Sequence, residues 1–192
     1  MARTPTVKLE LGYAAPNFRL QDVITGNQFT YHELRGSKGT VVMFICNHCP
    51  FVVHVLDELI RVGQDYKYRG IGFIAINSND VKNYPDDSPT RMKELAAVKQ
   101  FPFPYLFDES QEVAKAYFAA CTPDFSVFDA ENKCVYRGQL DDSRPGNDEP
   151  VNGKDLRTVL DLLVQGKAIP KNQKPSLGCN IKWKPGNEPA YY

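Results

Sequence analysis

The chain has 192 residues, 42% of them hydrophobic, and its 23 basic and 23 acidic side chains give a formal net charge of zero. This length suits one domain with a sizeable core. A balanced charge gives no strong field to attract nucleic acid or an anionic membrane surface, so neither is expected as a partner.

The cysteine content indicates a compartment. Five cysteines, an odd number, occur in a chain whose first eight residues, MARTPTVK, lack the apolar segment of a secretory signal. No apolar run near the N-terminus is long enough to span a bilayer. These features favour the reducing cytoplasm, where thiols carry out chemistry instead of crosslinking the fold.

Strand-like and helix-like segments alternate along the chain. The expected strands are Phe18–Leu20 and Gln28–Tyr31 as a hairpin, Thr40–Ile45, Gly72–Asp80, Tyr105–Phe107, Phe125–Phe128 and Cys134–Gln139. The expected helices are a turn at His32–Leu34, a long helix ending near Tyr68, Ser88–Lys99, Gln111–Phe118 and an amphipathic helix containing Leu156, Val159, Leu160 and Leu163. After Gly166 the chain is rich in Pro, Gly, Lys and Asn, which is typical of an extended tail.

This order predicts a thioredoxin-like α/β fold. A central mixed sheet flanked by helices would carry an N-terminal β-hairpin extension and an extended C-terminal tail. The division expected from the sequence is one domain over residues 1–166, with residues 167–192 packed on it as the tail.

The segment VVMFICNHCPFVVHVL carries the strongest functional signal. An apolar strand ends at Cys46, Cys49 follows after two intervening residues, and Pro50 opens a helix with a regular apolar stripe. Proline is tolerated at the first helical position because its missing N–H would be unpaired there. Cys49 is then the N-cap, where free N–H groups and the helix dipole favour an anion and lower a thiol pKa. The pattern predicts a thiol-redox site.

A metal site is the competing interpretation of these two cysteines. A structural zinc site normally needs a second CxxC or a histidine pair, and the other three cysteines stand singly. His48 and His54 are close in sequence, so a site of Cys46, Cys49 and one of these histidines stays open. On the expected helix, His54 lies on the polar face.

Several stretches in one order carry a resemblance to a known family: FICNHCPF, AINSND, YPDDSP, PFPYLFDESQEVAKAY, ACTPDF, RPGND and GCNIKW. The chain resembles redoxins of the alkyl hydroperoxide reductase/thiol-specific antioxidant group, in a peroxiredoxin-like branch with a CxxC motif. The resemblance extends from Pro16 to the tail. It implies that Thr122 and Pro123 form a cis-proline loop that packs against the active cysteine and presents its backbone to an extended substrate.

Two assignments of the attacking cysteine are compared. If Cys46 were the nucleophile, Pro50 would stand at the fourth helical position, where it removes a hydrogen bond and clashes with the preceding turn. With Cys49 as nucleophile, Pro50 fits, and Cys46 takes the place where peroxiredoxins keep a Thr or Ser. A thiol is a weak hydrogen-bond donor, and Thr122-Pro123 stands where peroxiredoxins usually have an activating arginine. Both departures count against a fast peroxidase.

The function expected from these residues is a thiol–disulfide oxidoreductase in which Cys49 attacks and Cys46 resolves. Cys121 and Cys179 are candidate resolving thiols. The alternative for Cys121 is a small buried packing residue, and the alternative for Cys179 is a tail cysteine that takes no part in the reaction. His48 either lowers the pKa of the thiolate and contributes to substrate binding, or is a solvent-facing loop residue.

The cysteines would carry the electrons, so no cofactor or metal is expected. The expected partners are a protein or small-molecule disulfide or a peroxide, and a thiol reductant such as thioredoxin. A peroxiredoxin-like peroxidase and a metal-binding thioredoxin-fold protein are the alternative functions.

Overall fold

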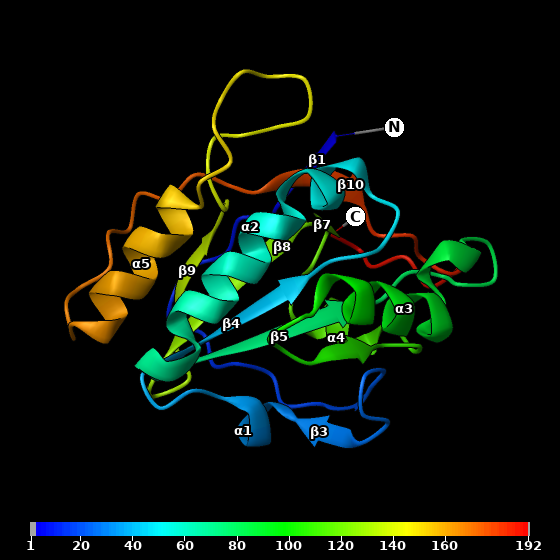
Figure 1. Ribbon diagram of the computed structural model, residues 1–192, viewed down its shortest axis with the longest axis horizontal. Helices are drawn as coiled ribbons and strands as arrows, with labels where there is room; N and C mark the ends of the chain where they lie inside the picture. Colours follow the sequence, from blue (N-terminus) through cyan, green and yellow to red (C-terminus); the bar gives the residue numbers. More distant parts are fainter. Residues whose placement is uncertain (1–2, 192) are drawn as a thin grey trace.

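The computed structural model describes residues 3–191, which form two β-sheets and five α-helices (Figure 1). The main sheet contains β2 (Arg19–Asp22), β3 (Gln28–Thr30), β4 (Gly39–Phe44), β5 (Ile71–Asn77), β6 (Tyr105–Phe107), β8 (Asp124–Asp129) and β9 (Cys134–Gly138). The small sheet contains β1 (Arg3–Pro5), β7 (Cys121–Thr122) and β10 (Leu177–Asn180). The α-helices are α1 (Tyr31–Leu34), α2 (Pro50–Tyr66), α3 (Pro89–Lys99), α4 (Glu112–Ala116) and α5 (Lys154–Val164).

The main sheet is mixed, with the strand order β3-β2-β6-β5-β4-β8-β9. The central strand β4 pairs parallel with β5 and antiparallel with β8. All six residues of β4 are buried, as expected for a strand covered on both faces. The end of β4 leads directly into Cys46 and Cys49, so the sheet centre fixes the position of the cysteine loop.

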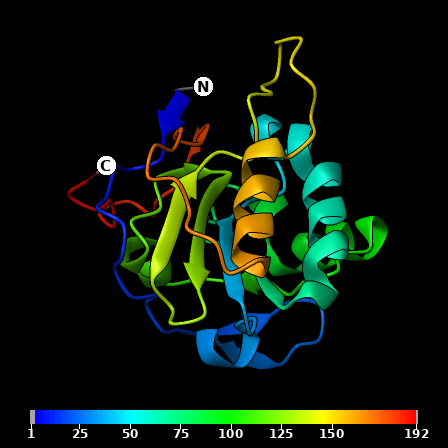
Figure 2. The same cartoon turned by 90° about the vertical axis from the view of Figure 1, so that its left-hand side faces the viewer.

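Helices cover both faces of this sheet. On one face, Val41 and Met43 of β4 pack into a core with the buried side chains of α2, α3 and α5. On the other face, Val42 and Phe44 pack with residues of α1 and α4 and with Trp183 of the C-terminal segment. Figure 2 shows α2 and α5 side by side on the same side of the sheet. No helix among residues 3–191 has the length and apolar character needed to cross a membrane.

The expected elements are present with shifted ends. The hairpin β2–β3 is paired, β6 has the expected bounds, and α3 begins at Pro89. Helix α2 ends at Tyr66 and continues as the 3-10 helix η1 (Lys67–Arg69), which stops at Gly70 with a φ of 87°. A second 3-10 turn, η2 (Pro85–Asp87), precedes α3.

The small sheet is the part of the fold that the sequence analysis does not predict. Residues after Gly166 are expected as an extended tail laid over the surface; within it, residues 177–180 form the strand β10 between β1 and β7. The strand has Gly178 and Cys179 at its centre, and no alternating pattern marks it as a strand. The pairing is short: Cys179 lies opposite Thr122, and Asn180 opposite Cys121.

Candidate active site

Cys49 stands at the N-cap of α2, as predicted from Pro50. Its φ of −69° and ψ of 121° are extended, and Pro50 is the first residue of the helix. The Cys49 carbonyl oxygen accepts the backbone N–H groups of Val52 and Val53, at 3.0 and 2.9 Å. The side chain is 1% exposed, so the thiol lies beneath the protein surface.

Cys46 and Thr122 surround the Cys49 sulfur. Cys46 Sγ lies 3.4 Å from Thr122 Oγ1, and the protonated Cys49 thiol donates to the Thr122 carbonyl oxygen at 3.1 Å. The hydrogen bond from the Cys46 thiol, followed by those from Cys179, Thr122 and the Val52 backbone, lowers the pKa of Cys49 from 9.0 to about 5, against the opposing effect of burial. The same hydrogen bond, together with burial, holds the pKa of Cys46 well above its ordinary value. The pair therefore divides into one thiolate and one thiol that donates to it.

Cys179 is the second thiol that contacts Cys49. It lies in β10, is 2% exposed, and shares a hydrogen bond with the Cys49 sulfur. Burial, followed by that hydrogen bond, raises the pKa of Cys179 to about 12, so it is protonated at neutral pH. The structure thus brings together three of the predicted cysteines, Cys46, Cys49 and Cys179, around the backbone of Thr122.

The Thr122–Pro123 peptide bond is cis. This agrees with the loop geometry that the family resemblance implies, and the loop packs against Cys49 through the Thr122 carbonyl. Cys121 is fully buried, its Sγ contacts the Pro123 carbonyl oxygen at 3.5 Å, and burial raises its pKa well above the ordinary value. Cys121 is therefore a protonated, packed thiol, and a resolving role for it stays a prediction.

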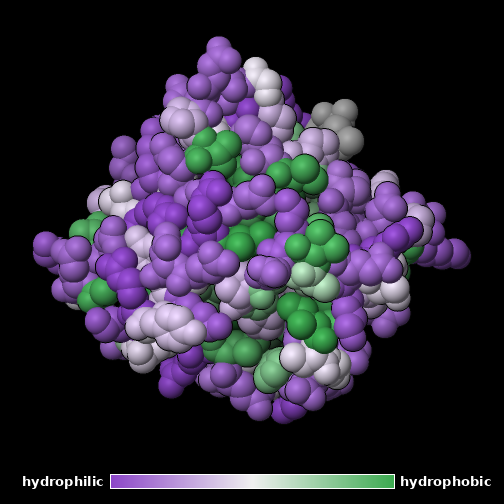
Figure 3. Space-filling model, viewed as in Figure 1, coloured by the Kyte–Doolittle hydropathy of each residue, from purple (hydrophilic) through white to green (hydrophobic). Residues whose placement is uncertain are grey.

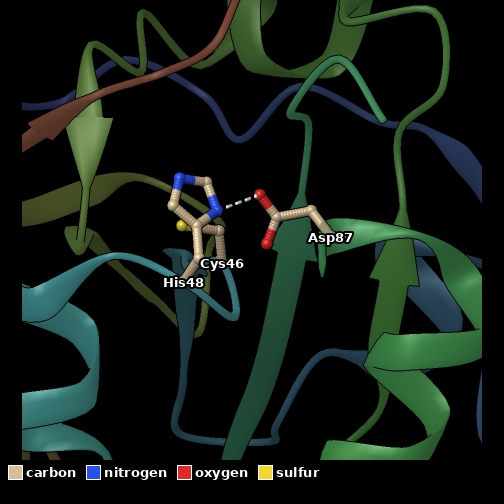
Figure 4. Close-up of side chains that lie close together, drawn as sticks. All are labelled: Cys46, His48 and Asp87. Carbon is tan, nitrogen blue, oxygen red and sulfur yellow. Dashed lines mark ion pairs between the residues drawn. The ribbon is translucent and has the colours of Figure 1, made fainter. Parts of the chain in front are cut away.

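His48 is held by a buried carboxylate that the sequence analysis does not identify. Its Nδ1 lies 2.7 Å from Oδ2 of Asp87, as Figure 4 shows. Asp87 is fully buried and also accepts the Asn47 backbone N–H and the Asn79 side-chain amide, each at 2.7 Å. Burial alone would raise the pKa of Asp87, but its bonds to His48, Asn79 and Asn47 outweigh it and lower the pKa. Asp87 in turn raises the pKa of His48, which favours the imidazolium form.

Tyr84 and Lys182 form a stack with the His48 ring. The Tyr84 ring stacks on the His48 ring with centroids 5.6 Å apart and planes 7° from parallel. The Lys182 ammonium lies 5.7 Å from the Tyr84 ring centroid. Asn79 and Asp87 lie in the quoted stretches AINSND and YPDDSP, so the resemblance marks their segments without indicating their roles.

One group among residues 3–191 has three side chains with ligand atoms close enough to hold a metal ion. It consists of Cys46, His48 and Asp87, whose ligand atoms lie within 4.8 Å of one another (Figure 4). His54 is not part of this group. A thiolate, an imidazole and a carboxylate are ligands suited to Zn²⁺, and Cys49 is not part of this group.

Comparisons with solved structures place the chain close to two proteins without assigned activity. An uncharacterized conserved protein from Geobacillus kaustophilus is 55% identical, with 97% of this chain and 98% of that chain aligned and a TM-score of 0.95. A hypothetical protein from Sinorhizobium meliloti is 45% identical over 95% and 100% of the chains, with a TM-score of 0.93. No curated protein matches the sequence.

A more distant neighbour confirms the fold. The thioredoxin domain of a thiol-disulfide oxidoreductase from Bacteroides vulgatus aligns with 80% of this chain and 99% of its own, at 15% identity and a TM-score of 0.61. The predicted thioredoxin-like fold is therefore correct. The model of the AhpC/TSA family matches residues 11–137, which include both Cys46 and Cys49. With its thioredoxin-like sheet and a cysteine at the N-cap of α2, the chain belongs to the AhpC/TSA family.

Proposed function

We propose that the protein is a thiol–disulfide oxidoreductase in which Cys49 is the nucleophile and Cys46 the resolving thiol. The observation that carries this proposal is that both thiols lie against Thr122, with Cys46 Sγ 3.4 Å from its hydroxyl oxygen and Cys49 Sγ 3.1 Å from its carbonyl oxygen. Their interaction there lowers the pKa of Cys49 to about 5 and raises that of Cys46. At neutral pH Cys49 is then a thiolate, the form that attacks disulfides, while Cys46 keeps its proton.

The reaction has two exchanges. The Cys49 thiolate attacks one sulfur of a substrate disulfide, a Cys49–substrate mixed disulfide forms, and the other substrate sulfur leaves as a thiolate that takes up a proton. Cys46 then loses its proton and attacks the Cys49 sulfur, which releases the second substrate thiol and leaves a Cys46–Cys49 disulfide. The substrate gains two electrons from the two cysteines, one proton from Cys46 and one proton from solvent, because Cys49 starts as a thiolate. A thiol reductant such as thioredoxin then reduces the Cys46–Cys49 disulfide by the same exchange and is itself oxidised to a disulfide.

Substitution of single cysteines tests this assignment. Cys49→Ser should abolish turnover of a model disulfide, whereas Cys46→Ser should still attack once and accumulate a mixed disulfide at Cys49, detected by intact mass. Cys134→Ser is the matched control, because Cys134 is buried and its thiol contacts the Tyr136 carbonyl oxygen, away from the site. Full activity of Cys49→Ser would refute the assignment.

A thiol peroxidase is the second candidate function. It is favoured by the family membership and by the 1% exposure of Cys49, because a small peroxide needs less room than a protein disulfide. In that reaction the Cys49 thiolate would be oxidised to a sulfenic acid, which a second thiol converts to a disulfide with loss of water. Peroxide consumption coupled to a thiol reductant, at a rate above that of free cysteine, would support it.

Metal binding is the third candidate, supported by the group Cys46, His48 and Asp87. These three side chains would hold a Zn²⁺ ion, with water or a substrate as a fourth ligand. Elemental analysis of the purified reduced protein is the test, and clearly less than one equivalent of metal would exclude a resident ion.

A further inference from the structure

The β10 strand covers the proposed nucleophile. Cys49 is 1% exposed, and the Cys179 thiol of β10 is hydrogen-bonded to its sulfur. The backbone of β10 pairs with β7 at Thr122, the residue whose carbonyl oxygen contacts Cys49. Figure 1 shows β10 close to β7 and to the end of α2 at which Cys49 lies. Any substrate sulfur that Cys49 attacks must lie next to its Sγ, where Cys179 now lies.

Gly178 permits this close approach. A Cβ at this position would lie 2.0 Å from the Thr122 carbonyl oxygen and 2.5 Å from its carbonyl carbon, both backbone atoms. No side chain fits at such distances without separating the strands. The residue before Cys179 is therefore constrained to glycine as long as β10 occupies the edge of β7.

The edge of β7 has the properties of a docking edge for a peptide. An extended segment binds a free strand edge through backbone hydrogen bonds, with side chains setting specificity. In this protein the edge is two residues long, begins the cis-proline loop and lies directly beside the nucleophile. The chain's own segment, Leu177–Asn180, is extended, pairs antiparallel with β7 and presents a cysteine to Cys49.

We propose that β10 is an internal occupant of this docking edge, and that an extended, disulfide-bearing segment of a substrate protein replaces it during the reaction. The proposal rests on the disulfide oxidoreductase function. The substrate cysteine takes the position of Cys179, and a small residue precedes it, in the position of Gly178. Substrates that fit are extended protein segments and not compact disulfide loops.

Hydrogen bonds just before and just after β10 hold both ends of the strand on the domain while its central residues leave the β7 edge. On one side, the Ser176 hydroxyl donates to the Pro123 carbonyl oxygen at 2.7 Å. On the other, the Lys182 backbone N–H donates to Asn79 Oδ1 at 2.8 Å. Between these contacts lie the two β7 pairings, the three pairings opposite β1, the hydrogen bond from the Ile181 N–H to the Ala120 carbonyl oxygen at 3.1 Å, and the Cys179–Cys49 contact. A local release therefore needs few hydrogen bonds to be exchanged, and the strand returns when the product leaves.

The displacement also decides which thiol resolves the mixed disulfide. Cys179 moves away with β10, whereas Cys46 remains beside Cys49, because it follows β4 and is 1% exposed within the core. Cys46 is then the thiol in place to attack the mixed disulfide, and Cys179 acts as the stand-in for the substrate cysteine between turnovers.

Gly178→Val tests the proposal, because its side chain must push β10 off the β7 edge. Alkylation of Cys49 by a bulky maleimide, read by peptide mass mapping, should become at least tenfold faster, and reduction of a protein disulfide should accelerate relative to that of a small disulfide. Asn172→Val is the matched control: it adds the same side chain at an exposed tail position and should leave both rates unchanged. A folded Gly178→Val protein with the wild-type alkylation rate would overturn the proposal.

A second measurement does not depend on that variant folding. In a Cys46→Ser, Cys179→Ser protein, Cys49 is converted to a mixed disulfide with a ten-residue cysteine peptide or, as control, with mercaptoethanol. Hydrogen exchange of the amides at residues 177–181 should be faster in the peptide adduct than in the unmodified variant and in the mercaptoethanol adduct, because the peptide alone also needs the β7 edge. Protection in the peptide adduct equal to that of the unmodified variant overturns the displacement. Failure of Cys49 to form either adduct refutes instead the disulfide exchange on which the proposal rests.

Discussion

Removal of the Cys46 thiol should raise the pKa of Cys49 by an amount that can be derived from its hydrogen bonds. The Cys46 hydrogen bond is the largest of the effects that lower this pKa from 9.0 to about 5. A hydrogen bond to a charged group contributes about 1.5–3 kcal/mol, which at ~1.36 kcal/mol per pH unit is about one to two pH units. In Cys46→Ala, the pKa of Cys49 should therefore lie between about 6 and 7.

The assay is the alkylation rate of Cys49 in the reduced protein as a function of pH, with the modified peptide identified by mass. At pH ~5.5 the thiolate fraction should fall about 3- to 25-fold, from about three quarters to between about a quarter and ~3%, and the midpoint of the alkylation profile should move up by about one to two pH units. Cys134→Ala is the control, because it removes a buried thiol that does not contact Cys49. A midpoint that stays near 5 in Cys46→Ala would refute the assigned hydrogen bond.

Three further predictions concern the ion pair of His48, the ion pair of Asp124 and the pH dependence of stability that Cys49 causes. Asp87→Asn removes the carboxylate that raises the pKa of His48, so the midpoint of its imidazole proton shift in an NMR titration should fall; an unchanged midpoint contradicts the ion pair. Arg137→Met leaves the fully buried Asp124 without its cation, which should cost about 3–5 kcal/mol in urea unfolding, and a cost below ~1 kcal/mol would exclude this role. The pKa of Cys49 is lower in the folded than in the unfolded protein, so the stability that its ionisation provides is complete above pH 9.0 and is lost as the pH falls to about 5. The difference in unfolding free energy between the reduced wild type and Cys49→Ser should therefore increase with pH across this window, by at most about 1.4 kcal/mol per pH unit. A difference that does not change with pH contradicts the low pKa of Cys49.

The predictable part of the site depends on local sequence. Pro50 indicates both the start of α2 and the N-cap position of Cys49, because the first helical turn is the place where proline costs least. The apolar run before Cys46 indicates a strand buried on both faces, which β4 is. In each case the information lies within a few residues, so spacing alone is enough to place the element.

The carboxylate beneath His48 could not be predicted in this way. Asp87 comes from a 3-10 turn about forty residues downstream, and it is one of three acidic residues near Tyr84 with no pattern to distinguish them. The other two, Asp80 and Asp86, also look like ordinary loop residues in the sequence. Only the packing of η2 against the cysteine loop selects Asp87 as the carboxylate that binds the Asn47 backbone.

The same argument applies to Cys179, and it has a chemical consequence. Its strand is defined by pairing with β7, a contact between segments more than fifty residues apart, so the sequence offers Cys179 as a candidate resolving thiol on the tail but does not place it in a strand. Cys179 both covers Cys49 and donates one of the hydrogen bonds that lower the pKa of Cys49. If β10 leaves, as we propose, Cys49 becomes accessible and at the same time loses this donor. The two changes shift its pKa in opposite directions, because burial raises the pKa and the Cys179 hydrogen bond lowers it. Cys179→Val removes the donor and keeps a side chain over Cys49. The pKa of Cys49 in that variant should be higher than in the wild type, and an equal pKa would show that Cys179 covers Cys49 without tuning it.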